Sequence, residues 1–158
     1  MKKIIISILF VIIIFSCNNK NSKEIPNEVI VIVELSKNKD KSEEELKKFT
    51  KRYSDYVKST EPNTLGWTYH DAGDKIILIE RYKDEDANII TAKNISPGGN
   101  RYKLLQESFD YHSLEKVTVI GGFTQKLVDF NKMTAEKVGF TAPFLYYPLI
   151  SGYSKNLK

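Results

Sequence analysis

The sequence between Glu61 and Ala87 predicts a β-hairpin followed by a helix. Residues 65–70 alternate in character, residues 71–74 have the composition of a tight turn, and residues 75–82 are rich in β-branched isoleucine. Gly73 supplies the freedom to take a positive φ that such a turn needs. Acidic residues at 84–86 fit the first turn of a helix, where the helix dipole favours negative charge. The segment therefore predicts two antiparallel strands and the helix that follows them.

The flanking segments extend this hairpin into one domain. Residues 29–35 are nearly continuous in apolar side chains, as expected of a strand covered on both faces. Ser42 and Glu45 form a capping-box pattern before a helix. The inward stripe of that helix is Leu46, Phe49, Tyr53, Tyr56 and Val57. Further helices are predicted at about 84–93, at about 102–111 and after Thr124, with strands at 117–120 and 144–150. This order predicts an α+β, ferredoxin-like βαββαβ fold with an extra C-terminal helix and strand.

The hairpin and its flanks carry a family resemblance. The loop at 61–64 reads Glu-Pro-Asn-Thr, Glu80 and Tyr82 follow at the end of the second strand, and Ala87 lies on the next helix. Residues 28–158 resemble the antibiotic-biosynthesis-monooxygenase (ABM) family, whose members commonly carry a Glu-Pro-Gly-Thr-like loop, a hairpin and Glu-x-aromatic-x-x-x-x-Ala. One position departs from the pattern: Thr91 stands where the family often has histidine.

The resemblance implies an architecture and a chemistry. Family members typically pair two such sheets into a dimeric α/β barrel, so a homodimer is expected here. The oxygen-inserting members use no cofactor, neither metal nor flavin. Their substrate, an aromatic or quinol-like small molecule, is deprotonated, and its electron-rich anion reacts directly with dioxygen.

Four residues of the hairpin are candidates for that site. Trp67 and Tyr69 share one face of their strand, and Glu80 and Tyr82 share one face of the next. We expect Trp67, Tyr69 and Tyr82 to bind a substrate ring, and Glu80 to act as a catalytic group. The alternative is that Trp67 and Tyr82 are ordinary core aromatics and that Glu80 pairs with a neighbouring cation.

His70 and His112 are the only histidines in the chain. His70 lies at the hairpin end of the predicted strand and His112 lies just after a predicted helix, so both are expected to be partly exposed. Each has an intrinsic pKa suited to a general base, and both are candidate catalytic residues. Two isolated histidines without a neighbouring carboxylate motif do not predict a metal site.

The N-terminus predicts an anchored protein. Lys2 and Lys3 precede an apolar run at 4–15 that is too short to span a bilayer as a helix. The sequence at 14–17, Ile-Phe-Ser-Cys, resembles a bacterial lipobox. It implies a signal peptide at 1–16, lipidation of Cys17 and a flexible tether at 17–27. We expect a protein of the bacterial cell envelope, lipid-anchored to a membrane and facing the periplasm or the exterior.

The balance of basic and acidic residues limits which kinds of partner we expect. Removal of the signal would leave 22 basic against 20 acidic side chains, a balance that argues against a nucleic-acid partner. The expected partner is a small hydrophobic or aromatic molecule. Two functional hypotheses follow: a membrane-anchored, cofactor-independent monooxygenase, or a non-catalytic lipoprotein that binds or senses a hydrophobic ligand in the same pocket.

Overall fold

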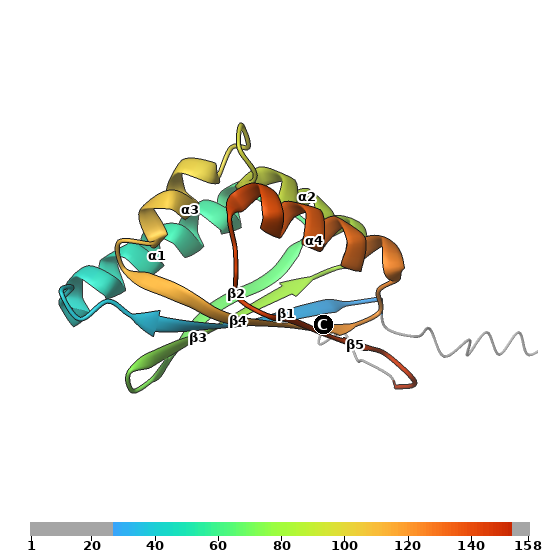
Figure 1. Cartoon of the computed structure of the whole chain (residues 1–158), viewed down its shortest axis with the longest axis horizontal. Coiled ribbons are helices and arrows are strands. Elements are labelled where there is room, and N and C mark those ends of the chain that lie inside the picture. Colours follow the sequence, from blue (N-terminus) through green and yellow to red (C-terminus); the bar gives the residue numbers. More distant parts are fainter. Residues whose placement is uncertain (1–26, 153–158) are drawn as a thin grey trace, which may run out of the picture.

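The protein forms two layers, a sheet and the helices that cover one of its faces (Figure 1). The structure, a computed structural model, describes residues 27–152, so the predicted signal and Cys17 lie outside the described residues. The strands are β1 (Val29–Lys37), β2 (Thr64–Ala72), β3 (Lys75–Tyr82), β4 (His112–Gly121) and β5 (Phe144–Pro148). The helices are α1 (Glu43–Thr60), α2 (Glu85–Ile95), α3 (Tyr102–Ser108) and α4 (Gln125–Val138).

The strand order in the sheet is β2-β3-β1-β4-β5. β1 lies in the middle and pairs antiparallel with β3 and β4, β2 pairs antiparallel with β3, and the added β5 runs parallel to β4. This mixed α+β arrangement agrees with the predicted order of elements and is compatible with a ferredoxin-like fold. No helix within residues 27–152 is long and apolar enough to cross a membrane.

Local sequence signals explain the first half of the chain. Gly73 has a φ of 78° in the β2–β3 turn, and its backbone N–H donates to Oδ1 of Asp71 at 3.1 Å. Ser42 and Glu45 form the predicted capping box at the start of α1, each side chain accepting from the other residue's backbone N–H. Both predictions from local sequence are confirmed.

Alternation along the strands divides the sheet into two faces. The residues that face the helices are buried and form the core, among them Val29, Val31, Val33 and Leu35 of β1. The opposite face, here called the open face, carries a row of apolar side chains beside charged ones such as Glu34 and Lys116, and no helix of residues 27–152 covers it (Figure 1). Strand register assigns to it Ile30, Ile32, Ile77, Ile79, Ile120, Leu145 and Tyr147.

β4 begins five residues before the expected strand. It starts at His112, which pairs with Lys37 of β1, and the register shifts between Glu34 and Leu35. Correspondingly, α3 ends at Ser108 rather than near 111. The expectation that His112 is partly exposed is wrong: only 6 % of its surface is exposed, because it enters the sheet instead of trailing the helix. Its preceding sequence lacks the apolar alternation that marks a strand.

Candidate functional site

A cavity of about 130 Å³ lies between the helix-facing side of the sheet and the helices. β1 forms its floor with Val31, Val33 and Leu35. A cavity of about 150 Å³ holds benzene, so this cavity is close in size to a single ring. Phe109, which lines it, is 42 % exposed, so the cavity approaches the surface near the end of α3.

The four predicted hairpin residues all line this cavity. Trp67 and Tyr69 of β2 lie across from Glu80 and Leu78 of β3, so their side chains share the helix-facing side of the sheet. Tyr82 is fully buried, and its hydroxyl donates to Oε2 of Glu80 at 2.5 Å. Glu80 therefore does not pair with a neighbouring cation; the adjacent Arg81 pairs instead with Glu28.

Glu80 is an acid whose protonation changes near neutral pH. Burial raises its pKa to about 7, and the hydrogen bond from Tyr82 and the positive charge of Arg101 only partly offset that effect. Desolvation also raises the pKa of Tyr82 well above its ordinary value, so the phenol stays protonated and remains a donor. A carboxyl group with a pKa near 7 can both accept and return a proton at physiological pH.

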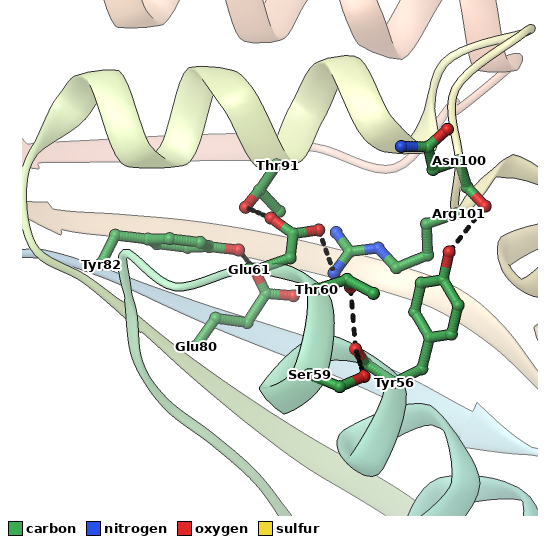
Figure 2. Close-up of polar contacts among 9 residues, drawn as sticks. All are labelled: Tyr56, Ser59, Thr60, Glu61, Glu80, Tyr82, Thr91, Asn100 and Arg101. Carbon is green, nitrogen blue, oxygen red and sulfur yellow. Dashed lines mark hydrogen bonds and ion pairs between the residues drawn. The ribbon is translucent and has the colours of Figure 1, made fainter.

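A buried ion pair lies beside this carboxyl group (Figure 2). Arg101 Nη1 and Glu61 Oε1 are 3.0 Å apart, with only 1 % and 3 % of the two side chains exposed. The Thr91 hydroxyl donates to the other oxygen of Glu61. The position where the ABM family often carries histidine is thus used here to hold a buried carboxylate.

The chain before α3 is shaped to deliver Arg101 into the interior. The Tyr56 hydroxyl donates to the backbone carbonyl of Asn100 at 3.0 Å (Figure 2), and the Arg101 N–H donates to the carbonyl of Asn94 at 2.9 Å. A side chain at Gly99 would meet the carbonyl oxygens of Asn94 and Lys93 at 2.3 and 2.5 Å. Only glycine therefore allows this loop to lie against the end of α2 and turn Arg101 inward.

Trp67 is already stacked by the protein itself. The Tyr53 ring lies parallel to it with centroids 5.6 Å apart, and the guanidinium carbon of Arg101 lies 5.0 Å from the indole centroid. The indole Nε1–H has no hydrogen-bond partner, although the Tyr69 hydroxyl lies near it. Nε of Arg101 also makes no hydrogen bond. These donors, together with Glu80, give one end of the cavity its polar character.

The two histidines are separated by the sheet. His112 lines the cavity, and burial lowers its pKa to about 4, so its ring is neutral at physiological pH. His70 alternates with Trp67 and Tyr69 on β2 and therefore points to the open face, where Thr68 Oγ1 lies 2.9 Å from its Nε2. His70 thus does not join Glu80 in the cavity. Within residues 27–152, no group of three or more His, Cys, Asp or Glu side chains is arranged to hold a metal ion.

Three residues of the site were not predicted from the sequence: Arg101, Glu61 as its partner, and Tyr53 as the stacking partner of Trp67. Arg101 does leave a signal, because it occupies the N-cap of α3 without any side-chain capping bond. Asp, Asn, Ser and Thr are preferred at that position, and a cation opposes the helix dipole there. A basic residue at the start of a helix, directly after Pro-Gly-Gly-Asn, therefore indicates a side chain whose interactions lie outside that helix.

Residues 27–152 form an α+β fold with a five-stranded sheet, four helices and an internal cavity. Among solved structures, the chain is similar to MupZ from Pseudomonas fluorescens, with a TM-score of 0.58 and 17 % sequence identity. The similarity covers 82 % of this chain and 91 % of MupZ, and at this identity it shows the fold alone. No protein-family model matches the chain, and no curated protein matches it. Membership of the ABM family therefore stays a prediction.

Proposed function

We propose that this protein binds a single-ring phenol or quinol in the cavity and oxygenates it without a cofactor. The observation that carries this proposal is the buried carboxyl group of Glu80 on the wall of a ring-sized cavity. The aromatic or quinol-like class follows from the resemblance at 61–64, Glu80 and Tyr82. The cavity volume of about 130 Å³ restricts these substrates to molecules with one ring.

Each polar group at this end of the cavity has a role in the proposed reaction. Glu80 takes the hydroxyl proton of the bound phenol, since its pKa of about 7 suits proton transfer at neutral pH. The Nε1–H of Trp67 and the Nε–H of Arg101, which have no hydrogen-bond partner, stabilise the phenolate oxygen that forms. Tyr82 holds the Glu80 carboxyl group in one orientation.

The overall reaction balances without an added reductant. With a hydroquinone, one atom of dioxygen forms a new bond to a ring carbon and the other leaves as water. The substrate supplies the electrons and protons for that water, and the product is a hydroxylated benzoquinone. The carbanion character that the phenolate places on the ring is what makes direct attack on dioxygen feasible.

Oxygen uptake tests this proposal. The full-length protein should consume oxygen with 1,4-hydroquinone or an alkyl-substituted hydroquinone faster than the same buffer without protein, with one water and one hydroxyquinone formed per dioxygen. Mass spectrometry with ¹⁸O₂ should show one labelled oxygen in the product. Uptake equal to the uncatalysed rate with every single-ring quinol and phenol would refute the oxygenase.

A second candidate function is binding without turnover. The observation that favours it is the use of Thr91, at the family's histidine position, to hold Glu61 rather than to reach a substrate. Ligand binding in the cavity with no oxygen uptake would support this reading. The lipoprotein would then hold or sense a small hydrophobic molecule.

We also propose a homodimer through the open face. The open face carries a row of isoleucines, and a lone domain would leave this apolar row in water. Ile79→Lys, at the centre of the open face, should convert a dimer into a monomer in analytical ultracentrifugation. The control is Ile90→Lys on α2, where the isoleucine is 48 % exposed on the helical layer and the dimer should persist. A monomeric wild type would refute the dimer.

The membrane anchor likewise remains a proposal, because Cys17 lies outside the described residues. A lipid on Cys17 would keep the cavity close to quinols dissolved in the membrane. Labelling cells with a fatty acid should mark the wild-type protein and leave Cys17→Ser unmarked. Equal labelling of the two would rule out this anchor.

A further inference from the structure

Glu61 is a buried carboxylate with a partner at each of its two oxygens. It lies at the C-cap of α1, and only 6 % of its surface is exposed. Its Oε1 lies 3.0 Å from Nη1 of Arg101, and its Oε2 accepts from the hydroxyl of Thr91. Residues from α1, α2 and the loop before α3 therefore converge on one ion pair.

Stability alone does not account for this ion pair. Taking two charges out of water costs free energy that their mutual attraction often fails to offset. Replacing a buried pair as a whole by apolar side chains of similar volume is often neutral or stabilising. Arg101 lines the cavity, so a role in the cavity would account for the pair.

Arg101 lies close to the carboxyl group of Glu80 but does not pair with it. Trp67 and Glu80 are directly opposite each other on β2 and β3, and the guanidinium carbon of Arg101 lies 5.0 Å from the Trp67 indole centroid. Figure 2 shows both carboxyl groups near the end of the Arg101 side chain, and the ion pair of Arg101 is with Glu61. A guanidinium without Glu61 would be attracted to the nearby Glu80 carboxylate.

We propose that Glu61 is a positioning residue: by pairing with Arg101 it holds the guanidinium beside Trp67 and offsets its charge, which leaves Glu80 free to take the substrate proton. This inference rests on the proposed function, since it takes Glu80 as the base. Without Glu61, the charge of Arg101 would favour the ionised form of Glu80 and make that carboxylate a weaker base.

No other charge in the cavity wall competes with this pair near neutral pH. Burial raises the pKa of each tyrosine that lines the cavity and lowers that of the histidine to about 4, so all of them are neutral there. These residues are Tyr53, Tyr69, Tyr82 and His112. The side chains that β1, α2, α4 and β5 contribute to the cavity are not titratable. Within residues 27–152, the charges that act on Glu80 are those of Arg101 and Glu61.

The single tryptophan of the chain provides a readout that does not need turnover. Trp67 lies opposite Glu80, so its fluorescence should change when Glu80 ionises. The full-length protein without substrate should show a fluorescence transition with a midpoint near pH 7. Glu80→Gln should lack this transition, which assigns it to Glu80.

Glu61→Gln is the variant that tests the proposal. Glutamine keeps the shape and still accepts from Thr91, but the charge of Arg101 is no longer offset, so the midpoint should fall by about one pH unit or more. The matched control is Glu107→Gln, which breaks the surface pair with Arg52 and should leave the midpoint unchanged. Glu61→Gln combined with Arg101→Met removes both charges and should return the midpoint to the wild-type value or above it.

The outcomes separate the role of Glu61 from the oxygenase. A purely structural role predicts that Glu61→Gln unfolds at lower urea concentration with an unchanged midpoint, and that result overturns the proposal. If Glu61→Gln fails to fold, Glu61→Asp decides, because it draws the carboxylate back from Arg101 by one methylene group: a lower midpoint supports the proposal and an unchanged one overturns it.

Oxygen uptake completes the comparison. The rise of the uptake rate with pH should move to lower pH in Glu61→Gln by the same amount as the fluorescence midpoint. A shifted midpoint without oxygen uptake by any of the proteins supports the effect of Glu61 on Glu80 and overturns the oxygenase. A wild type without a transition that depends on Glu80 overturns both.

Discussion

Replacing Glu80 with glutamine is expected to lower the rate of quinol oxygenation by about a hundred-fold to ten-thousand-fold. Glutamine keeps the size of the side chain and still accepts the hydrogen bond from Tyr82, but it cannot take a proton from the substrate. Hydroquinone affinity should change far less than the rate, because the Trp67 and Arg101 donors remain. The measurement is initial oxygen uptake, with Glu136→Gln, an exposed glutamate on α4, as the matched control.

The pH dependence of the oxygen-uptake rate tests the role of Glu80 directly. Glu80 acts as a base only when ionised, so the wild-type rate should rise with pH and level off above about 7. The Glu80→Gln variant should lose that rise. Retention of more than half the wild-type rate, or of the same pH profile, would remove Glu80 from the reaction.

The raised pKa of Glu80 also makes the stability of the fold depend on pH. The pKa of Glu80 is raised from 4.5 to about 7 in the folded protein, so the folded state binds more protons than the unfolded chain between these values. Wild-type stability should therefore fall as pH rises through that window, relative to Glu80→Gln, by on the order of 3 kcal/mol. The contribution of His112, whose pKa is lowered, has the opposite sign and is common to both proteins.

Removing Arg101 is the second change with a large expected effect. Arg101→Met should lower the free energy of unfolding by about 3–5 kcal/mol, because it leaves the Glu61 carboxylate buried without a counter-charge at the C-terminal end of α1. That loss is a large fraction of the typical stability of a domain, about 5–15 kcal/mol. Urea unfolding followed by Trp67 fluorescence measures it.

Two further variants test whether the loss of stability comes from burying an unpaired charge or merely from losing an arginine. Arg52→Met removes an arginine that pairs with Glu107 on the surface, with 55 % of the Arg52 side chain exposed, and should cost at most about 1 kcal/mol. The double variant Glu61→Gln with Arg101→Met should regain much of the lost stability, because no buried charge then remains. Equal losses for Arg101→Met and Arg52→Met would contradict the account of a buried pair.

Local sequence patterns sufficed for most of the fold and for part of the site. The β2–β3 turn at Gly73 and the capping box at Ser42 follow from interactions between residues a few positions apart. The common face of Trp67, Tyr69, Glu80 and Tyr82 follows from the two-residue period of a strand. These features needed no knowledge of the tertiary structure.

The sequence failed where long-range pairing decides. His112 was expected outside the regular structure, but pairing with Lys37 draws it into β4 and buries it. Tyr53 looked like one member of the α1 core stripe, and only the packing of α1 on β2 shows that it stacks on Trp67. His70 looked equivalent to His112 as a candidate base, but the pleat of β2 turns it to the opposite face.

The sequence by itself determined the order of the elements, through the alternation of apolar residues, the turn glycine and the helix caps. It also determined which side chains share a face, because that depends on the periods of the strand and the helix. Only the tertiary structure decided that Arg101, Glu61 and Thr91 meet beside Glu80, and that His112 lines the same cavity. These residues come from separate helices, strands and loops. Their burial and their pKa values depend on what surrounds them in space, which no local period encodes.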